Sequence, residues 1–114
     1  MAVKRREVRT IVILSLKGRF FGDAETDELE KAVMEEAGRD NRMLILNCAE
    51  CEALNSVAIG VLMRGFANYK SRGGEIKLCA LGKRLKDLFT MTKLIMVFDH
   101  HDTEEQAIAA FAGA

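Results

Sequence analysis

The stretch Asn55-Ser56-Val57-Ala58-Ile59-Gly60-Val61-Leu62 is the most informative part of this chain. It follows an apolar run at residues 43–47 (MLILN), which has the composition of a strand covered on both faces. Asn55 and Ser56 both have side chains that favour helix N-termini, so the stretch predicts a helix that begins here. The serine is either a plain helix cap or a site where the helix dipole would favour an added phosphate.

Apolar patterns on both sides of this stretch alternate between strand and helix periods. Runs of β-branched and aliphatic residues predict strands at residues 3–8, 10–17, 43–47, 75–81 and 94–98. Spacing and capping signals predict helices from Asp23 to Gly38, over 56–72, over 83–91 and after the capping box Thr103-Glu104-Glu105-Gln106. Residues 18–22 and the segments around Cys51 and His100 are predicted as loops. This alternation indicates an α/β fold with a mainly parallel or mixed sheet.

Length and composition restrict the class of protein. The 114 residues are enough for one core, and we assign residues 1–114 to a single domain. Nearly half of the residues are apolar (49%) and none is proline, which argues against a disordered linker. No apolar run is long enough to span a bilayer, and the first residues lack the apolar core of a signal peptide. We therefore expect a cytoplasmic protein without membrane insertion.

The charge pattern argues against nucleic acid as a partner. The formal net charge is zero, with 17 basic and 17 acidic residues. The basic cluster near the start has no interleaved aromatic residues; its members are Lys4, Arg5, Arg6 and Arg9. We expect this cluster on the solvent side of an edge strand, where charge discourages pairing with other chains.

Cys48 and Cys51 form a C-x-x-C pair, which raises two alternatives. A redox-active pair places its first cysteine at a helix N-terminus, but the predicted helix begins several residues later. Zinc would need His100 and His101 as further ligands, and adjacent residues of a regular element seldom point to one metal. We therefore expect these thiols, and that of Cys79, to be reduced and metal-free. A small thiol or metal enzyme remains the less favoured alternative.

Motifs for other chemistries are missing from the sequence. It contains no phosphate-binding glycine pattern and no G-x-S-x-G motif. Its scattered Asp and Glu residues suggest no carboxylate pair for acid–base catalysis. We therefore expect a module that is not an enzyme and needs no cofactor.

The order of elements and several motifs resemble the STAS domain, the fold shared by bacterial anti-sigma factor antagonists and sulfate-transporter tails. The resemblance covers essentially the whole chain. Its motifs are Leu16-x-Gly18, Leu44-Ile45-Leu46-Asn47, the stretch at 55–62, Gly73-Gly74-Glu75, Leu85-x-x-Leu88-Phe89 and the closing helix. The resemblance implies one α/β domain with a mixed sheet of four or five strands and with helices largely on one side.

The resemblance also implies a function. The family's central motif is D-S-x-G-L-G, in which a partner kinase phosphorylates the serine, and by that match Ser56 is the phospho-acceptor. The implied partner is an anti-sigma factor with serine kinase activity, which the chain would bind until phosphate on Ser56 ended the interaction. The implied contact residues lie on the outward side of the helix, with Val57 and Val61 as its apolar part. They are Asn55, Ser56, Gly60, Val61 and Arg64.

Three positions depart from the family pattern. Asn55 stands where the family has aspartate, Ala58 replaces its first glycine, and Phe21 lies near a position that is usually acidic. Asn55 keeps the capping oxygen but lacks the carboxylate that could orient the serine or a cation of the kinase. The alternative function is a STAS subunit that works without phosphorylation, in a stress-signalling scaffold or a lipid-transport complex. Homodimer formation and the identity of the sigma factor stay open at this point.

Overall fold

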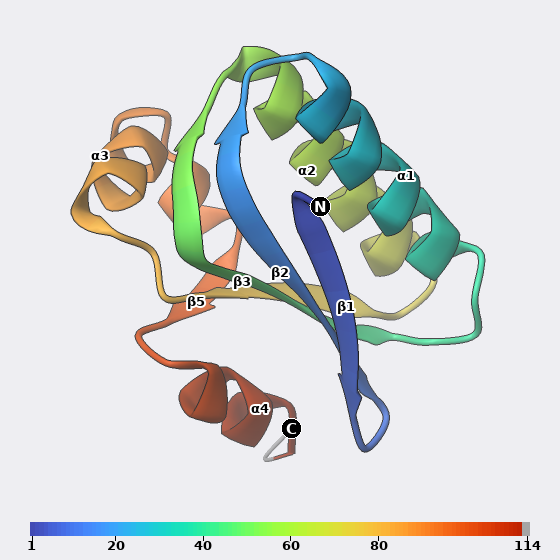
Figure 1. Ribbon diagram of the computed structural model, residues 1–114. Coiled ribbons are helices and arrows are strands. Elements are labelled where there is room, and N and C mark those ends of the chain that lie inside the picture. Colours follow the sequence, from blue (N-terminus) through green and yellow to red (C-terminus); the bar gives the residue numbers. More distant parts are fainter. Residues whose placement is uncertain (113–114) are drawn as a thin grey trace.

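Strands and helices alternate along residues 1–112, which are the residues that the computed structural model describes (Figure 1). The elements in chain order are β1 (Val3–Val8), β2 (Ile11–Phe20), α1 (Ala24–Ala37), β3 (Met43–Leu54), α2 (Ser56–Ser71), β4 (Glu75–Cys79), α3 (Lys83–Met91), the 3-10 helix η1 (Leu94–Met96), β5 (Asp99–His101) and α4 (Glu104–Ala112). Within residues 1–112, no helix has both the length and the apolar character needed to cross a membrane.

The five strands form one mixed sheet in the order β1-β2-β3-β4-β5. β1 pairs antiparallel with β2 through a tight turn, and the other three pairs of neighbours are parallel. Parallel neighbours need a crossover connection, which here contains α1, α2 or α3. The predicted α/β class and the mixed sheet of four or five strands are confirmed.

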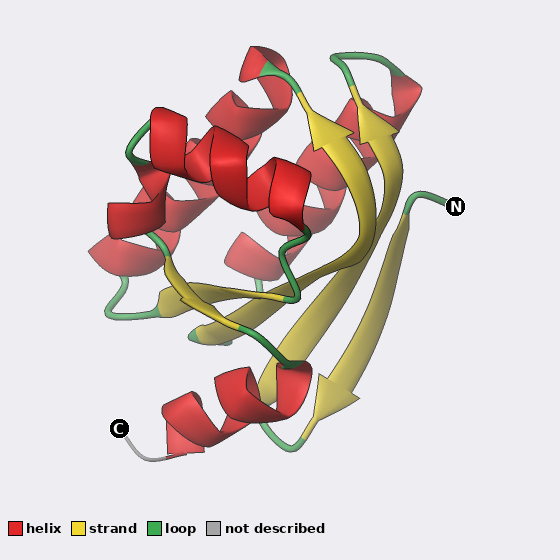
Figure 2. Ribbon diagram, turned by 90° about the vertical axis from the view of Figure 1, so that its left-hand side faces the viewer, coloured by secondary structure: helices red, strands yellow, loops and turns green. Residues whose placement is uncertain are grey.

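The helices cover the two faces of the sheet unequally (Figure 2). α1, α2 and α3 bury the larger core against one face, and α4 alone covers the other, where Ile13, Ile45 and Phe111 belong to a smaller cluster. The expectation that the helices lie largely on one side is therefore confirmed. In β3, Leu44 and Leu46 face the larger core and Ile45 faces the smaller one, all fully buried. Burial on both faces explains why this strand has a continuous apolar sequence.

Two strands are longer than the sequence predicted. β2 continues to Phe20 through Gly18, which has a φ of +94° close to shifts in the register between β2 and β3. β3 continues past Asn47 to Leu54, so the prediction that Cys51 lies in a loop is wrong. The two extensions pair with each other in parallel, and this long-range pairing has no local sequence signal.

The predicted strand at residues 94–98 is also wrong. Lys93, two residues after the end of α3, has a φ of 63°. This left-handed conformation turns the chain, and η1 begins at the next residue. The N–H of Phe98 then donates to the carbonyl of Leu94 at 3.1 Å, and the Phe98 side chain turns into the core. The last strand is the short β5, which contains His100 and His101 in place of the predicted loop.

β1 is an edge strand, as predicted, and its basic cluster faces solvent. Arg5 Nε donates to Oε2 of the buried Glu36 in α1 at 2.7 Å. On the other face, Arg6 pairs with Glu104 in α4. The basic residues therefore attach the edge strand to one helix on each side of the sheet.

Side-chain caps fix some helix starts and not others. The predicted capping box of α4 is confirmed, because the N–H groups of Thr103 and Gln106 each donate to the other residue's side-chain oxygen at 3.1 Å. Asp23 precedes α1 as predicted, but its side chain makes no capping bond. At that end the N–H of Gly22 donates to Thr26 Oγ1 at 2.8 Å.

Candidate partner-binding site

Asn55 is the residue that caps α2. Its Oδ1 accepts the N–H groups of Val57 and Ala58, both at 3.1 Å. Ser56 is then the first residue of the helix and is exposed, and Asn55 rather than Ser56 supplies the capping oxygen. Of the two capping residues that the sequence offered, Asn55 takes the structural role. The Ser56 hydroxyl is therefore available to a partner.

Replacing Asn55 by alanine should lower the free energy of unfolding by about 1 kcal/mol, because two N–H groups at the helix start lose their acceptor. Asn55→Asp keeps the acceptor and adds a negative charge at the positive end of the helix dipole, so it should be at least as stable as the wild type. Urea denaturation of the three proteins measures both effects. An alanine variant as stable as the wild type would contradict the capping role.

The loop between β2 and α1 lies beside the start of α2 (Figure 1). Gly22 has a φ of +87°, and a Cβ placed on it would lie 3.4 Å from Val57 Cγ2. Val57 is 53% exposed and Phe21 is 49% exposed, so two apolar side chains reach solvent near the Ser56 hydroxyl. We call Phe21, Gly22, Asn55, Ser56 and Val57 the α2 N-terminal surface.

Phe21 was not among the predicted contact residues. Phe20 and Phe21 are adjacent at the end of a strand, where successive side chains point to opposite faces. Phe20 is fully buried, and Phe21 therefore points outward. This alternation was the available signal, but it required knowing that β2 extends as far as Phe20.

The other predicted contact residues differ in their exposure to solvent. Val61 is only 4% exposed and packs into the larger core, so the prediction that it forms outward apolar surface is wrong. The reason is the helical period, since the residues of α2 that face the core are Ala58, Val61, Leu62, Gly65 and Tyr69. Gly60 is half-buried, and Arg64 is exposed and pairs with Glu30 of α1 at 2.7 Å. Ser56, Gly60 and Arg64 follow one another at intervals of four residues, so they share the face of α2 that does not pack on the sheet.

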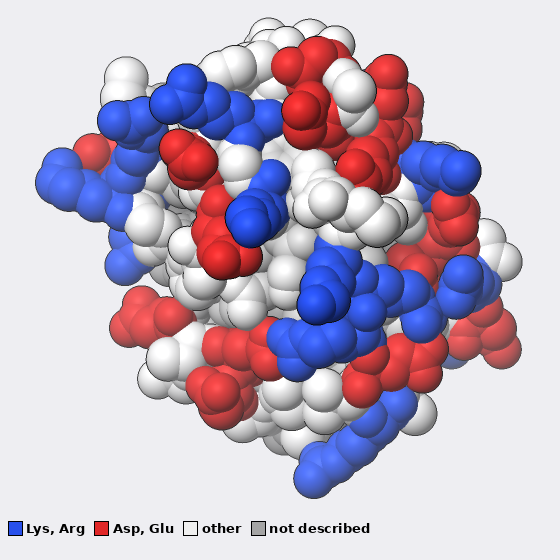
Figure 3. Space-filling view, viewed as in Figure 1, with Lys and Arg blue, Asp and Glu red and all other residues white. Residues whose placement is uncertain are grey.

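The electrostatic setting of Ser56 differs from that of the neighbouring helix start. α1 carries Glu25 and Asp27 in its first turn, whereas the first turn of α2 has no acidic residue. Acidic side chains gather over the start of α1 in the surface view (Figure 3). The positive end of the α2 dipole is therefore not matched by a carboxylate of its own first turn, which favours an added anion there.

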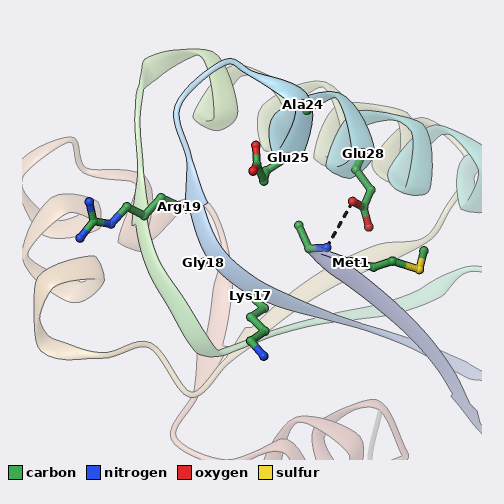
Figure 4. A pocket seen from close by; sticks show the side chains of 8 residues that line it. Met1, Lys17, Gly18, Arg19, Ala24, Glu25 and Glu28 are labelled. Carbon is green, nitrogen blue, oxygen red and sulfur yellow. Dashed lines mark hydrogen bonds between the residues drawn. The ribbon is translucent and has the colours of Figure 1, made fainter.

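A groove of about 430 Å³ lies between the chain start, β2 and α1 (Figure 4). Basic and acidic side chains both line it, among them Lys17, Arg19, Glu25 and Glu28. Glu28 already accepts the N–H groups of Ala2 and Val3 at 3.2 and 2.9 Å, so its carboxylate holds the start of β1 in place. This groove suggests no chemistry beyond that structural role.

The three cysteines are free and buried. Burial raises the pKa of Cys51 and of Cys79 to about 11, and raises that of Cys48 well above its usual value. Redox-active cysteines depend on the opposite shift, because the thiolate is the reactive form. Residues 1–112 contain no group of three or more His, Cys, Asp or Glu residues arranged to hold a metal ion.

Thiol titration should therefore show no fast-reacting cysteine in the native chain. At pH 8, a thiol with a pKa of about 11 is ionised at roughly one part in a thousand. We expect a disulfide reagent such as DTNB to modify the native chain slowly and to modify all three thiols at once in guanidinium chloride. Because the shifts are upward, the native rate should rise as the pH approaches 11. A thiol that reacts within seconds at neutral pH would contradict this expectation.

Comparisons with known proteins agree with this architecture. Residues 2–107 match the family model described as the STAS domain. An anti-sigma F factor antagonist of Paenibacillus polymyxa is 22% identical over 110 residues, covering 95% of this chain and 92% of the relative. The crystal structure of the protein TM1081 from Thermotoga maritima has a TM-score of 0.88 at 19% identity, covering 95% of this chain and 92% of that one.

The fold also matches SpoIIAA in its unphosphorylated form and, from Bacillus, in its phosphorylated form. The unphosphorylated form has a TM-score of 0.78 at 19% identity, covering 99% of this chain and 100% of that one. The phosphorylated form has a TM-score of 0.75 at 16% identity, covering 96% and 99%. Because the family model matches nearly the whole chain and the observed sheet and helices have the same arrangement, this chain belongs to the STAS domain family.

Proposed function

We propose that this chain is a non-catalytic cytosolic module that acts as an anti-sigma factor antagonist by binding an anti-sigma factor with serine kinase activity. The observation that carries the proposal is the α2 N-terminal surface, where the exposed Ser56 lies close to the exposed Phe21 and Val57. The relative from Paenibacillus polymyxa, which is named an anti-sigma F factor antagonist, supports the same assignment. Apolar side chains around one polar group are typical of a protein-binding surface.

Phosphorylation of Ser56 is the proposed switch. In that step the Ser56 oxygen bonds to the γ-phosphorus of ATP, ADP leaves with the electrons of the broken bond, and a base of the kinase takes the hydroxyl proton. Asn55 rather than Ser56 makes the capping bonds, so the modification leaves them in place. The phosphate adds nearly two negative charges beside Phe21 and Val57, where partner binding would need to exclude water.

A phosphorylation assay tests this switch directly. The chain is incubated with ATP and each kinase-type anti-sigma factor of its own organism, and the intact mass is then measured. We expect one phosphate per chain, located on Ser56 by fragmentation, and none on the Ser56→Ala variant. Phosphate on both proteins, or on neither with every partner tested, would contradict the switch.

Asn55 favours a second candidate, a STAS subunit that binds its partner without being phosphorylated. Asn55 has a neutral amide where the family has a carboxylate, so it offers no negative charge to a kinase site. Its Oδ1 also already accepts two N–H groups of α2. In this case the same surface binds a partner while Ser56 stays unmodified. A transporter ATPase gene next to this one, in place of an anti-sigma kinase gene, would support the second candidate.

A further inference from the structure

The end of α3 and the turn after it expose apolar side chains that no other element covers. Met91 is 82% exposed, Met96 is 83% exposed and Val97 is 39% exposed. Leu94 and Ile95, between them, pack against the larger core. A cluster of large apolar side chains in water is unusual for a surface without a binding role.

The backbone holds this cluster in one arrangement. The N–H of Lys93 donates to the carbonyl of Thr90 at 3.1 Å, and the N–H of Met96 donates to the carbonyl of Lys93 at 3.2 Å. Beneath the turn, Phe98 packs against Phe66 with a centroid distance of 5.0 Å and against Phe89 at 6.2 Å. The exposed side chains are therefore presented on a hydrogen-bonded turn, which lowers the entropy cost of binding.

The surroundings of the cluster are basic. Residues 83–97 contain four cations and one carboxylate, a local charge of +3 in a chain whose net charge is zero. Figure 3 shows Lys and Arg side chains gathered over α3. Asp87 pairs with Lys83 at 3.0 Å, and Asp102 from the loop before α4 pairs with Lys86 at 3.7 Å, so Arg84 and Lys93 are the cations considered for a partner. Arg84 lies on the same face of α3 as Met91, two turns away.

We propose that these residues form a second protein-binding surface, which takes an acidic amphipathic helix of a partner. We call it the α3–η1 surface and define it as Arg84, Met91, Lys93, Met96 and Val97. Methionine suits this task because its flexible thioether adapts to the apolar side chains of a helix laid across it. The cations complement carboxylates along the edges of such a helix and would speed its approach.

The observations favour a protein over a membrane. Surface-seeking helices insert aromatic and leucine side chains into lipid. In α3, Leu85 and Phe89 are buried in the core and Leu88 packs against it, so only Met91, Met96 and Val97 remain for lipid. The proposal does not depend on the α2 N-terminal surface, so Ser56→Asp should leave binding at the α3–η1 surface unchanged.

The test uses the full chain with ¹³C-labelled methionine methyl groups and a synthetic helix with Leu on one face and Glu on the other. We expect NMR shifts at Met91 and Met96 but not at Met34, which is 50% exposed on α1 and serves as the internal control. The dissociation constant should rise with added salt. It should also rise at least about tenfold in the double variant Met91→Gln/Met96→Gln and in Arg84→Glu/Lys93→Glu.

Several outcomes would overturn the proposal. Equal shifts at Met34, no shifts at all, or equal affinity for the same helix with Lys in place of Glu would exclude a specific acidic site. Stronger shifts at Met91 and Met96 with anionic phospholipid vesicles than with the peptide would identify a membrane. Self-association of the chain alone that the double methionine variant abolishes, measured by sedimentation velocity, would identify a second copy as the occupant.

Discussion

Ser56→Asp should weaken binding to the cognate kinase-type anti-sigma factor by at least ~1–3 kcal/mol, roughly five- to 150-fold in the dissociation constant. The new carboxylate lies on the same surface as the exposed Phe21 and Val57, so the partner must remove water from a charge where it covers apolar side chains. Isothermal titration calorimetry with the purified partner measures the change. Because the carboxylate carries less charge than a phosphate, the phosphorylated chain should bind more weakly still.

Two variants control for fold and for charge. Ser56→Ala should bind as the wild type does and should be about as stable, since Asn55 makes the capping bonds. Ser71→Asp places the same charge on an exposed serine at the far end of α2 and should leave the affinity within about twofold. Equal affinity of Ser56→Asp and the wild type would remove the switch, and the phosphorylation-independent function would replace it.

Gly65→Ala should destabilise the chain by about 1–2 kcal/mol, although alanine is the better helix former by about 1 kcal/mol. A Cβ on Gly65 would lie 2.6 Å from Cγ1 of Val33, where α2 packs against α1. Val33 is 1% exposed and β-branched, so its side chain has little freedom to move away. Urea denaturation measures the loss, and the steric conflict between the two helices is the expected cause.

Gly60 provides the matched control for this prediction. It lies on the same helix, but the nearest atom to a Cβ there is the flexible end of Arg64 at 3.5 Å. Gly60→Ala should therefore stabilise the chain by up to about 1 kcal/mol, the opposite sign from Gly65→Ala.

Adding Val33→Ala to Gly65→Ala should recover part of the lost stability through a coupling of about 1 kcal/mol or more. Additive effects of the two substitutions would show that Val33 is not the source of the conflict.

Several elements were predictable from the sequence to within a residue or two. The bounds of α3, the capping box of α4 and the helix stop near Gly73, which has a φ of +78°, all match the structure. Each of these features depends on contacts within about one helical turn, so the residues that form it are neighbours in the sequence. The position of Ser56 at the start of α2 was predictable for the same reason, because the capping residue Asn55 is its neighbour in the sequence.

The tertiary structure alone decided which residues of the candidate site reach solvent. β2 and β3 extend beyond their predicted ends because they pair with each other, and this extension brings Phe21 to the surface near Val57. The burial of Val61 depends on which face of α2 packs on the sheet, and the sequence prediction had placed Val61 on the outward face. These properties come from pairing and packing between segments far apart in the chain. A local sequence pattern carries little information about such partners.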